Sequence, residues 1–201
     1  MEHYFTNNQN LKSEIRKLTY KYQDEELEFL SDNGVFSKNK IDYASKLLVE
    51  AMLEKVPPDN KSLLDVGCGY GYIGITLGKL KGFTPSFADV NKRALHLCKR
   101  NIKLNNIKGK VIESNIYENI SEKYDYIVTN PPIRAGKEVV LSILQEAKNH
   151  LKEDGELWFV INKDQGAKST KKILESCYDI EVIKKNKGFY CFRAKFCWQK
   201  P

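Results

Sequence analysis

Between residues 62 and 176, strand-like and helix-like segments alternate along the chain. Short apolar runs typical of buried strands are each followed by a longer segment with helical spacing. Strands are predicted at residues 62–66, 83–89, 110–113, 124–129 and 156–161, and helices near residues 71–80, 92–105, 137–151 and 166–176. This alternation indicates βαβ units, in which right-handed crossovers build a parallel sheet that helices cover on both faces.

The C-terminal part of the chain breaks this alternation. Residues 178–184 and 188–197 are two strand candidates that only residues 185–187 separate. Strands with so short a link must pair antiparallel. We therefore predict an α/β fold with a mostly parallel, seven-stranded sheet that ends in an antiparallel C-terminal hairpin.

The N-terminal part shows a change of period. In residues 14–36 polar and apolar side chains alternate, and an Asp-Asn-Gly turn stands at residues 32–34, which predicts a small antiparallel β region. In residues 41–53 the apolar side chains fall at helical spacing. We therefore divide the chain into an N-terminal β-hairpin extension, residues 1–38, and a main domain, residues 39–201.

The composition limits the class of protein. Of 201 residues, 41% are hydrophobic and 29% are charged, which is a globular profile. No uncharged stretch is long enough to span a bilayer and the N-terminus lacks a secretion signal, so we expect a cytoplasmic protein without membrane contacts. The net charge of +7 permits nucleic acid as a partner. The five cysteines and three histidines show no zinc spacing, so we expect reduced thiols and no metal.

The strongest local motif follows the first predicted strand of the main domain. It reads Asp65-Val66-Gly67-Cys68-Gly69-Tyr70-Gly71, and its glycines allow the backbone to turn sharply and approach a ligand closely. Asp89 ends the next strand, 22 residues after Gly67, where a carboxylate can accept hydrogen bonds from both hydroxyls of a ribose. Because the two features occur together, they predict the site of a nucleoside cofactor.

A nicotinamide oxidoreductase would share both features. The spacing here, however, is G-x-G-x-G, and Tyr72 stands where the dinucleotide fingerprint has its third glycine. The chain also has no G-x-x-x-x-G-K-[ST], which disfavours a P-loop. A nucleoside cofactor other than a dinucleotide is therefore favoured.

A second motif, Asn130-Pro131-Pro132-Ile133, follows the predicted strand at residues 124–129. At the carboxyl end of a parallel strand, it borders the crevice in which α/β sheets bind ligands. Pro131 favours an extended Asn130, so the Asn130 side-chain oxygen and the Pro131 carbonyl can both accept hydrogen bonds from one planar NH2 group. This directs the nitrogen lone pair toward an electrophile, and we predict that the motif is catalytic. If acceptance is all that matters, Asn130→Asp should be tolerated better than Asn130→Ala.

In this order, the glycine loop, Asp89 and the N-P-P-I motif resemble class I S-adenosylmethionine-dependent methyltransferases that act on amino groups. With Gly34-Val35-Phe36-Ser37, Asp42 and Gly188-Phe189-Tyr190, the chain is similar to a short, single-domain member of the RsmC-like family, the bacterial 16S rRNA guanine-N2 methyltransferases. The resemblance implies a Rossmann-like fold, S-adenosyl-L-methionine as cofactor, and ribosomal RNA or the small ribosomal subunit as partner of a monomer.

The motifs are specific for methyl transfer to nitrogen and less specific for the substrate. Methylation of adenine N6 or of a protein glutamine amide therefore stays open. A non-catalytic RNA-binding module on this scaffold is the alternative outside the enzymes. The intact glycine loop and N-P-P motif argue against that last alternative.

The resemblance also implies roles for single residues. The glycine loop would hold the methionine part of the cofactor, Asp89 its ribose, and Asn115 would lie at the adenine. The full set of cofactor-binding residues would be Asp65, Gly67, Cys68, Gly69, Gly71, Asp89, Val90, Asn115, Ile116 and Asn130. Two positions depart from the family pattern, because Asn115 replaces a frequent acid and Ile133 replaces an aromatic that often stacks on the target base.

Basic residues interleaved with aromatic ones suit an RNA partner. Such residues are Lys12, Arg16, Lys17, Lys21, Lys38 and Lys40 among Tyr4, Phe5, Tyr20, Tyr22 and Phe36, with Lys163, Lys168, Lys171 and Lys172 beyond the fifth strand. Arg134 and Lys137 directly follow the N-P-P motif. We expect Phe36, Arg134 and Lys137 to contact the substrate. A solvated lysine face over a small hairpin core is the other interpretation of the N-terminal residues.

Overall fold

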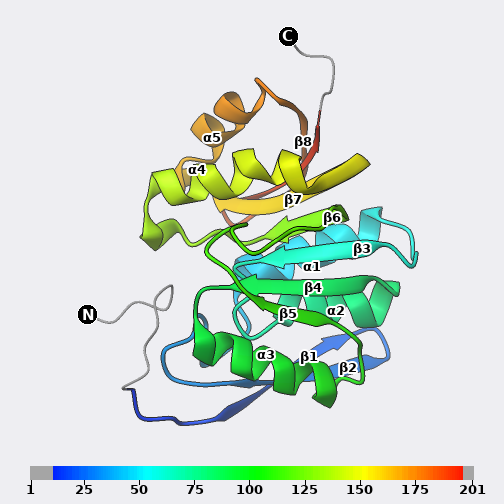
Figure 1. Cartoon of the computed structure of the whole chain (residues 1–201), viewed down its shortest axis with the longest axis vertical. Helices are drawn as coiled ribbons and strands as arrows, with labels where there is room; N and C mark the ends of the chain where they lie inside the picture. The colour runs from blue at the N-terminus through cyan, green and yellow to red at the C-terminus, as the bar shows by residue number, and fades with distance from the viewer. Residues whose placement is uncertain (1–10, 197–201) are drawn as a thin grey trace.

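The computed structural model describes residues 11–196, and its centre is one seven-stranded sheet (Figure 1). The strand order is β5-β4-β3-β6-β7-β9-β8. Neighbouring strands from β5 to β7 run parallel, and β9 pairs antiparallel with both β7 and β8. The strands span β3 Ser62–Val66, β4 Thr84–Asp89, β5 Lys110–Glu113, β6 Tyr124–Thr129, β7 Leu151–Asn162, β8 Tyr178–Asn186 and β9 Phe189–Phe196. The predicted fold class is confirmed.

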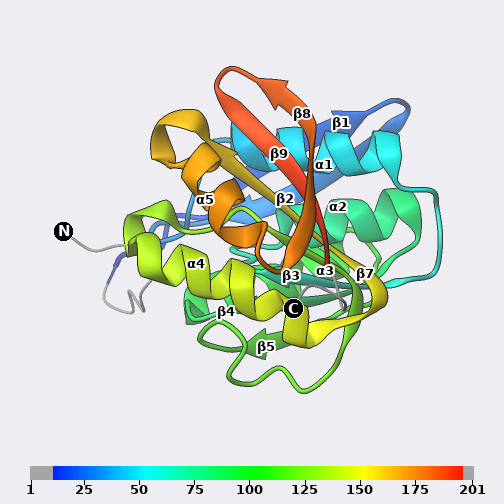
Figure 2. The same cartoon turned by 90° about the horizontal axis from the view of Figure 1, so that it is seen from above.

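Helices cover both faces of the sheet (Figure 2). One core contains side chains of α1 (Tyr43–Lys55), α2 (Tyr72–Lys81) and α3 (Lys92–Leu104), and the other those of α4 (Lys137–Glu146) and α5 (Ala167–Leu174). Successive strand residues feed the two cores in turn, as Trp158 and Phe159 of β7 do, because side chains alternate across a strand. Three short 3-10 helices complete the elements, namely η1 Ile133–Ala135, η2 Ala147–His150 and η3 Lys163–Gln165.

The N-terminal hairpin pairs β1 (Arg16–Tyr22) with β2 (Glu25–Ser31) and packs into the first of these cores. Asn101 on α3 continues the ladder of β2, because its side chain accepts a hydrogen bond from Leu30 N at 2.7 Å and donates one to Leu30 O at 2.9 Å. The predicted hairpin is confirmed. The boundary after residue 38 stays a prediction.

The register of the sheet brings three strand ends to one edge. Val66 pairs with Ala88, and Asp65 pairs with Val128. The strand order changes direction between the neighbouring strands β3 and β6. The chain continues from β3 to β4 on one side of this pair and from β6 to β7 on the other side. Such a switch point is where open α/β sheets bind ligands.

Predicted element ends differ most from the structure between residues 146 and 156, and the strand predicted at residues 178–184 continues to Asn186. The helix predicted to reach residue 151 is α-helical only to Glu146, and β7 begins at Leu151 and not at residue 156. Within residues 11–196, no helix is long and apolar enough to cross a membrane. Tyr4 and Phe5 of the predicted RNA-binding residues, and one of the five cysteines, Cys197, lie outside the described residues.

Candidate active site

A cavity of about 340 Å³ lies at the carboxyl ends of β3, β4, β5 and β6. Segments that follow all four strands, and the segment before α1, form its walls. Predicted site residues among its lining are Phe36, Gly67, Cys68, Gly69, Asp89, Val90, Asn115, Ile116, Asn130, Pro131 and Pro132. The structure thus brings together most of the residues that the sequence proposes for a cofactor and a reacting amine.

Two predicted cofactor residues lie behind the cavity wall. Asp65 is buried, and its Oδ2 accepts a hydrogen bond from Gly74 N at 2.9 Å, so it joins β3 to α2. Burial raises the pKa of Asp65 to about 7, against the hydrogen bond from Gly74, which lowers it. Gly71 caps α2 at φ +93°, and a Cβ there would lie 2.8 Å from Cys98 Sγ. Neither residue is among those that line the cavity.

The other two glycines of the loop open onto the cavity. Gly67 and Gly69 have φ values of +70° and +56°, which side chains rarely adopt. A Cβ at either position would meet nothing within 4 Å. The backbone at these two residues therefore leaves room for a ligand that lies directly against it.

Asp89 joins the glycine loop to the end of β4. Its Oδ2 accepts a hydrogen bond from Gly69 N at 2.8 Å, and its Oδ1 accepts one from Asn91 N at 2.9 Å. Burial raises the pKa of Asp89, although these hydrogen bonds lower it. A carboxylate has further lone pairs, so Asp89 can still accept hydrogen bonds from a ligand hydroxyl.

Asn130 has a fixed orientation. Its Nδ2 donates hydrogen bonds to Asp42 Oδ2 at 3.0 Å and to Ser45 Oγ at 2.9 Å. A carboxylate only accepts, so the amide nitrogen must face Asp42 and Oδ1 must face away. In residues 11–196 no hydrogen bond is described for Asn130 Oδ1 or for the Pro131 carbonyl. Both oxygens are therefore able to accept hydrogen bonds from a ligand.

Two residues that line the cavity have a strained backbone conformation. Ser37 and Ile116 have φ values of +56° and +53°, in the left-handed region. For a β-branched residue such as Ile116 this conformation is a genuine outlier. Strained residues gather at ligand sites, where the surrounding structure holds them in place.

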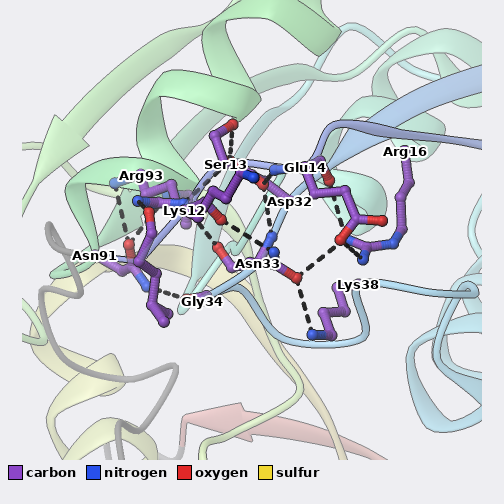
Figure 3. A network of polar contacts seen from close by, with 12 residues as sticks. Lys12, Ser13, Glu14, Arg16, Asp32, Asn33, Gly34, Lys38, Asn91 and Arg93 are labelled. Carbon is purple, nitrogen blue, oxygen red and sulfur yellow. Dashed lines mark hydrogen bonds and ion pairs between the residues drawn. The ribbon is translucent and has the colours of Figure 1, made fainter.

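A network of polar contacts holds the segment 33–40 beside the cavity (Figure 3). Asp32, only 3% exposed, accepts hydrogen bonds from Ser13 Oγ, Glu14 N and Arg93, the last at 3.2 Å. Burial alone would raise the pKa of Asp32, but these hydrogen bonds and that of Asn33 N lower it below its usual value. Asn91, which caps α3, donates from Nδ2 to Gly34 O at 2.9 Å. The segment is thus tied to the end of β4, next to Asp89.

Two of the three predicted substrate residues, Phe36 and Arg134, lie at the outer side of the site, whereas the third, Lys137, and the predicted catalytic Ile133 do not line the cavity. Phe36 is 37% exposed and lines both the cavity and a neighbouring hollow, which Arg134 and Lys38 also border. Ile133 is partly buried against the core under α4. Lys137 is exposed at the start of α4 and borders neither hollow.

Sequence reasoning missed Ser45 and the contact of Asn130 with Asp42. A local signal was present, because Asp42 stands three residues before Ser45 and accepts a hydrogen bond from Ser45 N at 2.8 Å, as helix N-caps do. That signal predicts a cap and gives no hint of a partner at residue 130. In the part of the chain that the structure describes, no group of three or more metal-ligating side chains occurs.

A family model described as methyltransferase small domain matches residues 26–193. The chain belongs to this family. "Uncharacterized protein YbxB" of Bacillus subtilis is 41% identical over 96% of this methyltransferase-family chain and 98% of its own length. The family model and the relatives below confirm the resemblance to the RsmC-like methyltransferases.

Two further relatives carry a functional name. "Ribosomal RNA small subunit methyltransferase C" of Photorhabdus laumondii is 37% identical over 64% of this chain and 39% of its own length. The Thermus thermophilus 16S rRNA N2 G1207 methyltransferase, solved with AdoMet and guanosine, has a TM-score of 0.83 at 24% identity and covers 93% of this chain. The chain matches 52% of that structure, so it spans about two fifths to one half of the length of these relatives.

Proposed function

We propose that this chain transfers a methyl group from S-adenosyl-L-methionine to the N2 amine of a guanine in 16S ribosomal RNA. The family model and the names of the relatives support this proposal. Because the chain spans only part of the curated rRNA methyltransferases, their activity is carried over here as a proposal. One observation within the chain supports it most, namely the fixed orientation of Asn130 in the cavity of the glycine loop.

The described residues fit the proposed cofactor. Gly67 and Gly69 leave open space where a side chain would stand, and Asp89 lies at the end of the adjacent strand with lone pairs free for ribose hydroxyls. Asn115 and Ile116 border the same cavity and would lie at the adenine. When bound, S-adenosylmethionine supplies an electrophilic methyl group on a sulfonium.

The contribution of the protein to the reaction is orientation. Asn130 Oδ1 and the Pro131 carbonyl would accept the two N–H groups of the target amine. This holds the amine so that its lone pair points into the cavity, and it favours the developing positive charge on nitrogen. Asn130 and Pro131 would thus present the amine nitrogen to the methyl group that the cofactor would supply, the electron pair of the methyl–sulfur bond would stay with the cofactor, and the proton that the nitrogen loses would pass to solvent.

We propose that the protein acts as a monomer, as the resemblance to the RsmC-like family implies. We propose the cytoplasm, where ribosomal RNA is, as its location. Phe36 and Arg134 at the outer side of the cavity would contact the guanine and a neighbouring phosphate, and Lys137 a phosphate further along.

The test is the mapping of modified nucleosides by mass spectrometry in rRNA from cells that lack the protein. Loss of one N2-methylguanosine in 16S rRNA, restored by the wild-type chain and not by Asn130→Ala, is the expected result. A missing N6-methyladenosine in the same map, or a missing methylated glutamine in a peptide map of proteins from the same cells, would instead support one of the alternative amino substrates. Unchanged rRNA and protein methylation would contradict the proposal. As a binding control, calorimetry should show that Asp89→Ala weakens the binding of S-adenosylhomocysteine.

A further inference from the structure

The turn between β8 and β9 lies beside the first turn of α1 (Figure 2). β9 begins opposite the end of β7, because Phe189 pairs with Asn162. Since β7 runs parallel to β6, this turn emerges at the same edge of the sheet as Asn130. Tyr43, the first residue of α1, follows directly after Asp42, the partner of Asn130. The turn therefore lies at the same edge of the sheet as the candidate active site, on the side opposite to β5.

Aromatic rings and ammonium groups meet at this place. The rings of Tyr43 and Phe189 lie 5.8 Å apart, and Lys187 Nζ lies 4.9 Å from the centre of the Tyr43 ring. Lys163 follows β7, and its N–H donates a hydrogen bond to Gly188 O at 2.8 Å. Both rings are partly exposed and both lysines are exposed. We call Tyr43, Lys163, Lys187 and Phe189 the turn cluster.

The turn itself breaks a local sequence rule. Asn186 pairs with Phe189, so Lys187 and Gly188 form a two-residue hairpin turn, and both have positive φ, at +46° and +81°. Such turns favour Asn-Gly, because asparagine tolerates the left-handed conformation better than lysine does. A residue that fits its backbone poorly is expected where function requires its side chain.

The charges of the turn cluster differ from those of the N-terminal hairpin. On the hairpin, Lys17 pairs with Glu28, and Lys21 pairs with Glu26 at 2.8 Å. Among the ion pairs described for residues 11–196, none involves Lys163 or Lys187. Acidic residues close by are Asp164, next in the chain to Lys163, and Asp42, which faces Asn130. The turn cluster thus carries positive charge that its own surroundings leave mostly uncompensated.

We propose that the turn cluster binds single-stranded RNA beside the target nucleotide, with a base on the aromatic rings and phosphates at the two lysines. Single strands require partly exposed rings next to ammonium groups that no described ion pair engages, since bases stack on aromatic side chains and phosphates pair with cations. The turn cluster lies at the same edge of the sheet as Asn130, so RNA that extends from the methylated guanine would reach it. This inference rests on the proposed function, because it names the part of the substrate next to the methylated base.

The test compares two variants that remove equal charge. Lys163→Gln/Lys187→Asn alters the turn cluster, and its asparagine suits the left-handed position, so the fold is preserved. Lys17→Gln/Lys21→Gln removes two charges from the hairpin and serves as the matched control. Binding of a labelled single-stranded oligoribonucleotide is measured by fluorescence anisotropy between about 50 and 200 mM salt.

We expect the turn-cluster variant to bind more weakly and its slope of log K against log salt to become flatter by about 1.4, since each phosphate contact to a single strand contributes about 0.7. The hairpin control should keep the wild-type slope. Tyr43→Leu, which keeps apolar packing, should weaken RNA binding on the order of tenfold without changing the affinity for S-adenosylhomocysteine.

Three results would overturn the inference: no RNA binding by the wild type, a wild-type slope in the turn-cluster variant, or equal losses in both double variants. The methylation of 16S rRNA by the wild type tests the proposed function separately. Methylation together with a wild-type slope in the turn-cluster variant would reject only the turn cluster. RNA binding that depends on the turn cluster, without methylation of guanine, would reject only the proposed reaction.

Discussion

Asn130 and Asp42, 88 positions apart in the chain, are joined by a hydrogen bond of 3.0 Å from the amide nitrogen to the carboxylate. The same Asp42 oxygen accepts a hydrogen bond from Ser45 N at the start of α1. The helix end and the N-P-P motif are thus held by one carboxylate. Because a carboxylate only accepts hydrogen bonds, Asp42 also determines which atom of the Asn130 amide faces the cavity.

The first prediction concerns substitutions of Asn130. Asn130→Ala removes one oriented acceptor, so the rate of methylation should fall on the order of 10² to 10³, with unchanged affinity for S-adenosylhomocysteine. From the sequence alone, we expect Asn130→Asp to lower the rate of methylation less than Asn130→Ala does. The structure reverses that expectation, because an aspartate would place a second carboxylate against Asp42. Single-turnover methylation of an rRNA fragment and calorimetry measure the two effects.

A double variant provides the control for this prediction. Asn130→Asp/Asp42→Asn restores one donor and one acceptor between the two positions, so it should recover part of the activity that Asn130→Asp loses. Turnover close to wild type in Asn130→Asp alone would show that the contact with Asp42 has no part in catalysis.

The second prediction distinguishes the roles of Asp42 and Ser45, the two residues that accept hydrogen bonds from Asn130 Nδ2. Asp42→Ala should lower the free energy of unfolding by about 1 kcal/mol, because it removes the N-cap of α1, and should also lower kcat. Ser45→Ala leaves that cap in place and removes only the acceptor at 2.9 Å from Asn130 Nδ2. It should lower kcat with a smaller effect on stability. Urea unfolding and methylation kinetics compare them, and a kcat unchanged in both variants would contradict the positioning role.

The mostly parallel sheet with its antiparallel C-terminal hairpin, and the cofactor loop, could be predicted from the sequence because both depend on local patterns. Alternating periods define βαβ units, and the residues after each parallel strand must meet at one edge. Gly67, Asp89 and Asn130 therefore come together in the cavity as expected. The structure confirms the strand pairing that this argument requires.

Contacts between distant segments could not be predicted in this way. The bond between Asn130 and Asp42 depends on how α1 docks on the sheet. The pairing of Lys21 with Glu26 depends on the register of the hairpin. Asp65 belongs to the cofactor motif by sequence, yet the structure turns one of its oxygens toward Gly74, since α2 packs against β3. Each case requires tertiary geometry, which local periodicity does not contain.

The third prediction contrasts two glycines of the loop. Gly69→Ala adds a methyl group where nothing lies within 4 Å, so its cost is that of the positive φ, about 1 kcal/mol, while affinity for S-adenosylhomocysteine should fall clearly. Gly71→Ala places a methyl group 2.8 Å from Cys98 Sγ and from Ile75 Cδ1. It should therefore lower the free energy of unfolding several times more than Gly69→Ala does. Thermal unfolding and calorimetry distinguish the effects. Equal losses of stability in the two variants would contradict this division of roles.

The fourth prediction concerns the pH dependence of stability and follows from Asp65, which is fully buried with Oδ1 unpaired. Burial raises the pKa of Asp65 to about 7 in the folded chain, above the value of about 3.9 expected when unfolded. Between these values the folded state binds the extra proton, so the contribution of Asp65 to stability falls as pH rises from about 4 to about 7 and is constant above.

The variant Asp65→Asn cannot titrate, and its amide oxygen can still accept a hydrogen bond from Gly74 N. The free energy of unfolding of the variant relative to the wild type should therefore increase between pH 4 and pH 8, by up to about 4 kcal/mol for a shift of three units. Urea unfolding of both proteins across this range measures the difference, in which all other titrating groups cancel to first order. Parallel stability curves would show that Asp65 is charged throughout and that another donor satisfies Oδ1.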